Sequence, residues 1–243
     1  MSLPTTRLTF DYDLQCPERP AEGFYSAEVA GHRLQPMLTF LPTGYEPNYA
    51  YPLLVFFHNH GGSEKQVMKL APRVSRRNYL ALGLRGPVRT TRADGSSGYG
   101  WDGDDIDANL DDYVFGAIDR VMEEYSIHPD RIFLAGVCEG ATAAYRMAFR
   151  FPERFAGLAA FNGQLPQPGP IMRLPLVRKL PIFIGHGIAN AQIPLTLAQK
   201  DHKLLYIAGV DVQFKTYATT HKLHSTMLRD LDRWTMKQVN GYE

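Results

Sequence analysis

A cysteine between two glycines is the position in this chain best suited to covalent chemistry. Cys138 stands at the centre of residues 136–140, which read Gly-Val-Cys-Glu-Gly and follow an apolar run. A buried strand, a tight turn and a helix in that order form a G-x-S-x-G nucleophile elbow, here with cysteine in place of serine. The strand and helix backbones of such an elbow approach closely, which explains Gly136 and Gly140. A buried cysteine beside an ordinary turn is the alternative, because free cysteine often only fills a core.

Repeated strand and helix patterns surround this turn. Residues 7–14, 24–29 and 33–41 are rich in β-formers, which predicts an antiparallel strand meander. After residue 50, continuous apolar runs typical of buried parallel strands alternate with helical spacings. We expect strands at 53–57, 79–84, 131–137, 155–161, 181–185 and 210–217. A first helix is expected to begin at Ser63, with Gln66 completing a capping box. Further helices are expected over 106–125, 138–151, 194–205 and 227–235. This order predicts an α/β fold with a mostly parallel sheet: one domain over 1–243, with N-terminal strands in 1–50 and a catalytic core in 51–240.

Composition and charge exclude several classes of function. The 243 residues carry 26 Lys and Arg against 25 Asp and Glu, so there is no basic excess for nucleic acid. No stretch approaches the roughly 20 apolar residues of a membrane span, and the first 13 residues lack a secretory pattern. Cys16 and Cys138 are able to form one disulfide, but we expect free thiols in a reducing, cytoplasmic compartment.

Polar residues follow several of the predicted strands, where ligands of parallel sheets bind. In chain order, residues 57–62, 136–140, 184–190 and 220–221 resemble the motifs of the α/β-hydrolases, in particular the phospholipase/carboxylesterase branch. The resemblance extends from about residue 53 to residue 234. It implies an α/β-hydrolase fold with helices on both faces of the sheet. It also implies Cys138 as nucleophile, Asn190 in place of the acid and His221 as base, with the backbone N–H groups of His60 and Glu139 as oxyanion hole.

Two residues depart from the family pattern: Cys138 replaces serine and Asn190 replaces aspartate. A thiol ionises more readily than a hydroxyl, so Cys138 and His221 can exist as a thiolate–imidazolium pair before substrate binds. A neutral asparagine then suffices to orient the histidine, as in Cys-His-Asn enzymes. A decayed serine hydrolase, or one altered in the laboratory, fits the same two changes.

Each site residue has a simpler interpretation. Asn190 is also a common turn residue, and His221 is a loop histidine with His224 as an alternative base. Glu139 is a favourable acid at a helix N-terminus, although its carboxylate would raise the pKa of the neighbouring thiol. His58 and His60 alternate like a metal pair, but no third ligand is evident, so we expect no metal and no cofactor.

A long, glycine-rich loop is expected over 85–104. Its residues 87–103 and the irregular, proline-rich segment 164–180 are expected to form the pocket. Tyr99, Trp101 and Gln164 are its candidate substrate-binding residues, and Arg85 and Arg89 are candidates to hold a carboxylate. The predicted function is hydrolysis of small-molecule carboxylic esters, thioesters or lactones through a thioacyl-cysteine. An acyltransferase or cyclase using the same site, and an inactive binding protein, remain alternatives; the oligomeric state is left open.

Overall fold

A computed structural model describes residues 20–29, 34–92, 94–102, 106–167 and 174–241, with the side chains of 106–109 excepted. The strand expected over 7–14 and Cys16 lie outside the described residues.

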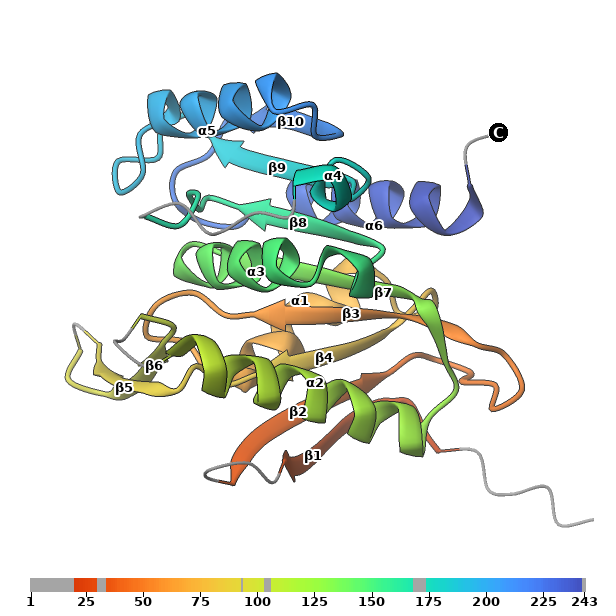
Figure 1. The fold of residues 1–243 in the computed structure, drawn as a ribbon. Helices are drawn as coiled ribbons and strands as arrows, with labels where there is room; N and C mark the ends of the chain where they lie inside the picture. Colours follow the sequence, from red (N-terminus) through yellow and green to blue (C-terminus); the bar gives the residue numbers. More distant parts are fainter. Residues whose placement is uncertain (1–19, 30–33, 93, 103–105, 168–173, 242–243) are drawn as a thin grey trace, which may run out of the picture.

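An eight-stranded sheet forms the centre of the molecule (Figure 1), and its strand order is β1-β2-β4-β3-β7-β8-β9-β10. The strands are β1 (Gly23–Val29), β2 (Gln35–Leu41), β3 (Tyr51–Phe57), β4 (Leu80–Leu84), β7 (Ile127–Val137), β8 (Gly157–Phe161), β9 (Ile182–Gly187) and β10 (Val212–Tyr217). β1 and β2 run antiparallel to each other, as does β2 to β4, whereas β4, β3, β7, β8, β9 and β10 are parallel neighbours. The N-terminal strands therefore extend the same sheet as the predicted core.

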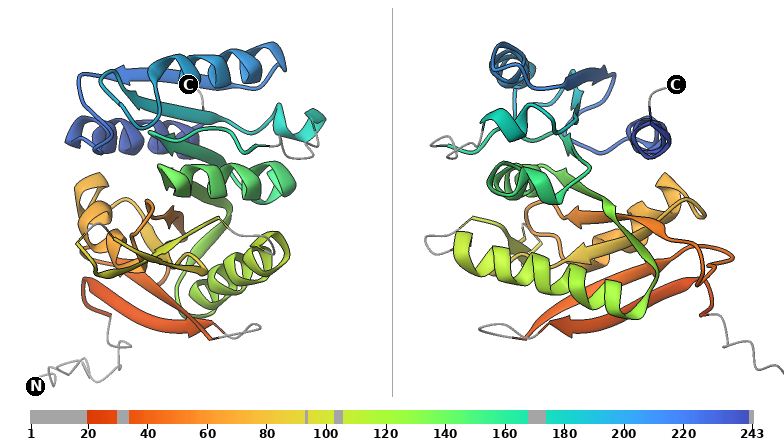
Figure 2. Two further views of the ribbon diagram at one scale, coloured as in Figure 1. Left: turned by 90° about the vertical axis from the view of Figure 1, so that its left-hand side faces the viewer. Right: turned by 45° about the vertical axis from the view of Figure 1, so that its right-hand side comes forward.

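Helices cover both faces of the sheet. They are α1 (Val67–Val74), α2 (Ile106–Glu124), α3 (Glu139–Arg150), α4 (Leu174–Val177), α5 (Leu195–Ile207) and α6 (Ser225–Asn240). Figures 1 and 2 show α2, α3 and α5 on one face and α1 and α6 on the other. Each face has its own apolar core, because alternate residues of a strand point to opposite sides. In β3, for example, Leu53, Val55 and Phe57 pack with the α2–α3 side and Leu54 and Phe56 with the α1–α6 side.

Two local expectations were wrong. Ser63 makes no side-chain cap: a 3₁₀ turn (Glu64–Gln66) precedes α1, and the Gln66 side chain binds the backbone N–H and the side chain of Asn59 instead. The segment after Arg85 is not an irregular loop, because it contains the antiparallel hairpin β5 (Val88–Thr91) and β6 (Ser97–Gly100). The glycines of β6 hid this strand from the sequence pattern, since glycine is unusual within strands.

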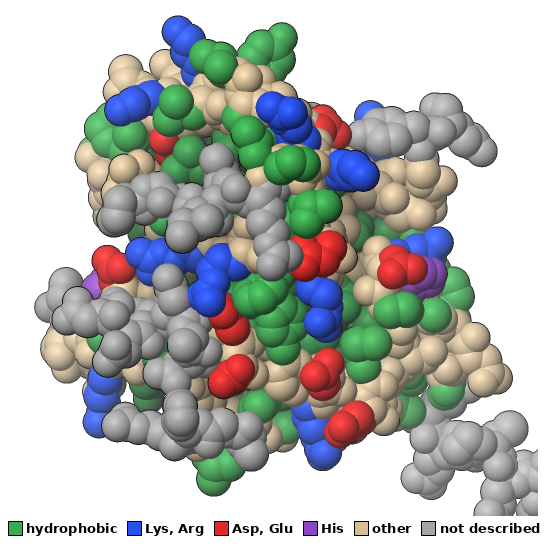
Figure 3. Space-filling model, viewed as in Figure 1, with side chains coloured by type: hydrophobic (Ala, Val, Ile, Leu, Met, Phe, Trp, Pro, Cys, Tyr) green, Lys and Arg blue, Asp and Glu red, His purple; other side chains and the backbone are tan. Residues whose placement is uncertain are grey.

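The exposed face in Figure 3 carries Lys and Arg interspersed with Asp and Glu, and no broad area of one sign. Among the described residues, no helix combines the length and the apolarity needed to cross a membrane.

Candidate active site

Cys138 lies on a strained turn between β7 and α3, as the glycine pattern predicts. Its φ and ψ are 56° and −121°, a left-handed conformation that non-glycine residues rarely adopt. The Cys138 N–H donates to the Phe161 carbonyl at 2.9 Å, which fixes the turn to the end of β8. A β-carbon at Gly140 would collide with the carbonyl oxygens of Phe57 and His58. The elbow is therefore pressed against the end of β3, and only glycine fits there.

Two backbone N–H groups face the Cys138 sulfur, and they belong to His60 and Glu139. Glu139 is the first residue of α3, and the first amides of a helix have no acceptor within it. The loop of His60 is bound to the hairpin: Gly61 N–H donates to the Tyr99 carbonyl at 2.9 Å, and Tyr99 N–H to the Gly62 carbonyl at 3.0 Å. The hairpin thus holds one of the two amides in place.

The side chains of the same two residues also contact each other. His60 Nδ1 lies 2.7 Å from Glu139 Oε2, although 79 residues separate them in the chain. Glu139 Oε1 accepts a hydrogen bond from the backbone N–H of Trp101 at 2.8 Å. The Glu139 carboxylate therefore links the elbow, the His60 loop and the end of the hairpin.

His221 is held by Asn190 in a defined tautomer. Asn190 Oδ1 accepts the backbone N–H groups of Gln192 and Ile193, each at 3.1 Å, which fixes this atom as the oxygen. His221 Nδ1 lies 3.0 Å from the same oxygen, so Nδ1 carries the proton and donates. The lone pair of Nε2 is then available to act as a base.

Asn162 connects the two halves of the site, a role that the sequence did not reveal. It directly follows Phe161, the partner of Cys138, and it has a positive φ of 50°. Its Nδ2 donates to the His221 carbonyl at 3.0 Å, and its Oδ1 accepts the Gly187 N–H at 2.8 Å. A polar residue immediately after a buried strand was the available signal.

The pKa shifts indicate a neutral resting pair, which differs from the expected thiolate–imidazolium pair. Burial raises the pKa of the Cys138 thiol and the Glu139 carboxylate adds to the rise, against the effect of the two N–H groups. Burial lowers the pKa of His221, and His186 lowers it further. Among the described residues no hydrogen bond joins the thiol to the His221 ring, and the sulfur faces the amides instead.

The pocket beside Cys138 has a volume of about 240 Å³ and an opening to solvent. Its lining residues are Trp101, Asp102, Cys138, Glu139, Thr142, Ala143, Arg146, Gln164, Gln167 and Ile193. Trp101 and Gln164 thus lie where the sequence analysis put them, but Tyr99 does not line the pocket. Thr142 and Arg146 were not among the pocket residues predicted from the sequence.

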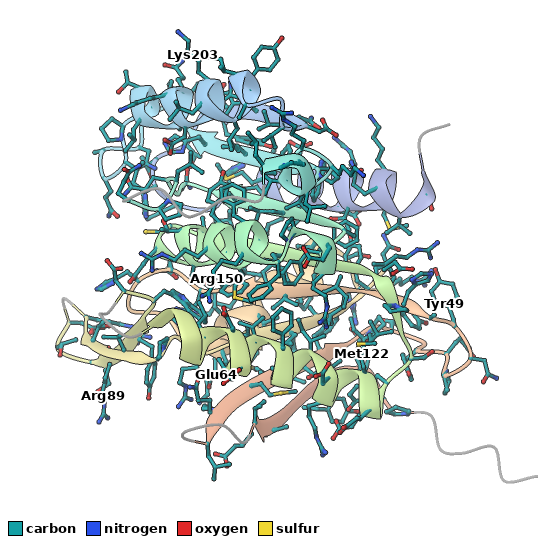
Figure 4. All side chains as sticks on the ribbon, viewed as in Figure 1. Tyr49, Glu64, Arg89, Met122, Arg150 and Lys203 are labelled. Carbon is teal, nitrogen blue, oxygen red and sulfur yellow. The ribbon has the colours of Figure 1, made fainter. Side chains whose placement is uncertain are left out.

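Other candidates have structural partners. The ring of Tyr99 stacks under Arg85, which is paired with the buried Glu64 through two bonds of 2.6 Å. Arg89 points from β5 into solvent (Figure 4). His224 caps α6, its Nδ1 accepting the Thr226 N–H at 3.3 Å.

His58 and His60 do not form a pair. His58 is buried, with its Nδ1 donating to the Asn59 carbonyl and its Nε2 accepting the Gly86 N–H, each at 2.8 Å. Burial lowers the pKa of His58 to about 4, so the ring is neutral. Within the described ranges, no group of three or more His, Cys, Asp or Glu side chains is arranged to hold a metal ion.

Comparison with known families identifies the chain. The model of the phospholipase/carboxylesterase family matches residues 102–239, more than half of the sequence. The chain belongs to this family. The match includes the elbow, Asn190 and His221, whereas the His60 loop precedes it.

Curated relatives carry esterase names. A probable carboxylesterase of Oryza sativa subsp. japonica is 29% identical over 131 residues, which cover 53% of this chain and 49% of that protein. Carboxylesterase SOBER1 of Arabidopsis thaliana is 24% identical over 53% of this chain and 57% of its own length. Acyl-protein thioesterase 1 of Saccharomyces cerevisiae is 28% identical over 47% and 53%. The chain spans about half the length of the curated relatives it matches.

Solved structures of esterases share the fold. A Bacillus cereus carboxylesterase superposes with a TM-score of 0.65 at 18% identity, covering 84% of this chain and 94% of the other. A ferulic acid esterase from Anaeromyces mucronatus gives 0.69 at 12% identity, covering 98% and 100%. The expected α/β-hydrolase fold, with its mostly parallel sheet and N-terminal antiparallel strands, is confirmed.

Proposed function

We propose that this protein hydrolyses carboxylic esters or thioesters, with Cys138 as nucleophile, His221 as general base and Asn190 as the residue that orients His221. The observation that carries the proposal is the meeting of a thiol on a strained turn with two backbone N–H groups that face its sulfur. A buried cysteine that only filled the core would need neither the strain nor the amides. Family membership and the esterase names of the relatives support the reaction class.

The first half of the proposed reaction forms a thioester. The ester carbonyl oxygen occupies the space between the N–H groups of His60 and Glu139, and the thiol turns towards His221. As sulfur bonds to the carbonyl carbon, the thiol proton passes to His221 Nε2. The two amides stabilise the tetrahedral oxyanion, a contribution of about 3–4 kcal/mol for each such donor in related sites. The intermediate expels the alcohol, which takes the proton from His221.

The second half restores the enzyme. His221, neutral again, accepts a proton from water as the water oxygen attacks the thioacyl carbon. The second tetrahedral intermediate breaks the carbon–sulfur bond, and His221 returns the proton to sulfur as the carboxylic acid leaves. Because the raised pKa of the Cys138 thiol and the lowered pKa of His221 both favour the neutral forms, His221 acts in this proposal as a base at the moment of attack and not as a standing counter-ion.

Intact-mass measurement with activated esters tests this function. We expect 4-nitrophenyl acetate to acetylate Cys138 and to be turned over, and Cys138→Ala to abolish both. The matched control is Cys16→Ser, which removes the other cysteine of the chain and is expected to retain adduct and turnover. Absence of both adduct and turnover with esters and thioesters alike, or full turnover by Cys138→Ala, would contradict the proposal.

An inactive binding protein is the second candidate, favoured by the raised pKa of the thiol and by the neutral residue at position 190. The double variant Cys138→Ser, Asn190→Asp separates the two. Esterase activity that appears only in the double variant would indicate a decayed serine hydrolase. Activity in the wild type that the double variant lowers would indicate a working thiol enzyme.

A further inference from the structure

One face of α3 extends from the nucleophile to an arginine. Cys138, Thr142 and Arg146 stand four residues apart, so they follow one another along the same side of the helix. All three line the pocket of about 240 Å³. The pocket therefore contacts both the elbow and Arg146.

Arg146 has an unusually weak partner for a half-buried arginine. Its side chain is 20% exposed, and its ion pair with Asp102 measures 3.5 Å to a carboxylate that is 80% exposed. A guanidinium has five N–H donors, and exposed pairs of this kind contribute little. No second hydrogen bond from Arg146 occurs among the described residues.

Neighbouring arginines show the contrast. Arg150, one turn further along α3 (Figure 4), binds Asp111 at 2.6 Å. Arg85 makes two bonds of 2.6 Å to Glu64. These two arginines have close acidic partners, whereas the contact with Asp102 at 3.5 Å is the one hydrogen bond of Arg146 within the part of the chain that the structure describes.

The pocket is lined by two carboxylates, Asp102 and Glu139, and by the guanidinium group of Arg146. At the elbow, the Glu139 carboxylate is bound to His60 and to the Trp101 N–H. Thr142, in the middle, donates its hydroxyl to the Gln164 carbonyl at 2.9 Å and is thereby occupied. A substrate with a negative group is repelled by the Glu139 carboxylate at the elbow, whereas Arg146 attracts it in competition with Asp102, whose exposed carboxylate lies 3.5 Å away.

We infer that Arg146 is a specificity-determining residue that binds a carboxylate carried by the ester substrate, so that the natural substrate class is the anionic half-ester. The inference rests on the proposed function, since it orients an ester on Cys138. Eight residues of helix rise about 12 Å, and helical side chains lean towards the N-terminus, so the carboxylate would lie roughly 6–10 Å from the reacting carbonyl. A planar guanidinium matches a carboxylate through two parallel N–H bonds.

Matched ester pairs test the inference and tell which side of the ester carries the charge. For an acyl-side anion the pair is 4-nitrophenyl hydrogen adipate and its methyl ester; for an alcohol-side anion it is 4-acetoxybenzoate and its methyl ester. Each kcat/KM value is divided by the rate constant for the alkaline hydrolysis of the same ester without enzyme. We expect one pair to show a preference of about 10-fold or more for the anion, as for hydrogen bonds to charged groups.

Substitutions at Arg146 are expected to remove that preference. Arg146→Gln should bring the ratio within each pair close to 1, and Arg146→Lys should leave an intermediate ratio because the charge stays and the paired geometry is lost. Arg120→Gln is the matched control, because Arg120 pairs with Glu124 on the outer surface of α2. It should keep the wild-type ratio.

A binding measurement separates this inference from the proposed function. Monomethyl adipate is titrated into the wild type and into Arg146→Gln by calorimetry, and we expect about 10-fold weaker binding to the variant. If no ester is hydrolysed but this difference appears, the carboxylate site stands and the hydrolase proposal fails. If neither pair shows a preference in an active wild type, or if the preference survives in Arg146→Gln, the inference is overturned.

Discussion

At the scale of residues, the surroundings of Asn190 are built for an acceptor. Two backbone N–H groups and the His221 ring converge on its oxygen. Its amide nitrogen, however, lies 3.4 Å from His186 Nε2, and that atom is 2.9 Å from the Ile193 carbonyl, to which it donates. Two hydrogen-bond donors, Asn190 Nδ2 and His186 Nε2, therefore face each other. A carboxylate oxygen in place of Asn190 Nδ2 would accept from His186 and would suit this position better. The contacts around position 190 thus suit an aspartate at least as well as the asparagine that stands there.

Asn190→Asp should move the acidic limb of the pH profile to higher pH. Burial and His186 hold the pKa of His221 below its ordinary value, so the wild type keeps a neutral base as the pH falls below about 6.5. A carboxylate beside the ring favours the imidazolium, raises the pKa of His221 and removes the base at a higher pH. The check is kcat/KM for 4-nitrophenyl acetate between pH 5 and pH 9, with an expected loss of several-fold at the acidic end. The exposed Asn48→Asp is the control, and an unmoved limb would count against His221 as the base.

Cys138, His221, Asn190 and the two amides of the proposed site could be picked out as candidates because each stands in a short motif after a strand. Other parts of the site depend on distant contacts. The His60–Glu139 pair joins residues 79 positions apart, and Arg146 matters only because Asp102 holds it weakly. Tyr99 lies on the predicted segment, but its partner Arg85 turns it away from the pocket. Local patterns contain no information on such pairings.

At the scale of elements, the elbow is a junction of three backbones: β7, α3 and the end of β3. Apolar runs and helical spacing predicted these elements, since burial on both faces of a parallel sheet leaves a clear pattern. The hairpin β5–β6 was missed because both strands have only four residues and because β6 contains two glycines, Gly98 and Gly100, that the fold uses for close approach. The 3₁₀ turn before α1 was missed because the Gln66 side chain binds Asn59 and makes no cap.

Gly140→Ala should destabilise the protein strongly. The added β-carbon would meet the backbone oxygens of Phe57 and His58, which side-chain movement cannot relieve. We expect a loss of about 3 kcal/mol or more in the free energy of unfolding, measured by urea denaturation. Gly23→Ala is the control, because the nearest atom to its β-carbon would be at 3.8 Å, an ordinary contact. Equal stability of the two variants would contradict the close approach at the elbow.

At the scale of the whole molecule, stability near the site depends on a half-buried ion pair. Burial acts to raise the pKa of Glu64, but the hydrogen bonds and charge of Arg85 outweigh it and hold the pKa below the ordinary value. The pair joins the turn before α1 to the end of β4. Because the pKa of Glu64 is lower in the folded than in the unfolded protein, its ionised carboxylate stabilises the fold above the unfolded-state pKa of about 4.3. This contribution to the free energy of unfolding is lost as the pH falls through the lower pKa of the folded state.

Glu64→Gln should lower stability at neutral pH by about 3 kcal/mol, since breaking a buried pair leaves Arg85 without its counter-charge. The variant should also lose less stability than the wild type when the pH falls from 6 to 3. Thermal unfolding across this range measures both effects. Glu123→Gln, at an exposed pair of 3.7 Å on α2, is the control and should follow the wild type. A variant with the wild-type acid profile would show that Glu64 does not carry the acid sensitivity.

The hairpin has a consequence for the dynamics of the site. Because Gly61 and Tyr99 each donate across the junction between the His60 loop and β6, opening the ribbon frees both amides in one event. Their protons should therefore exchange with solvent deuterium at a common rate, slower than those of the exposed residues around Gly95. In the proposed reaction, the His60 amide can receive an oxyanion only while its loop is held by the hairpin. The time for which it is held then depends on how often the two four-residue strands β5 and β6 open locally.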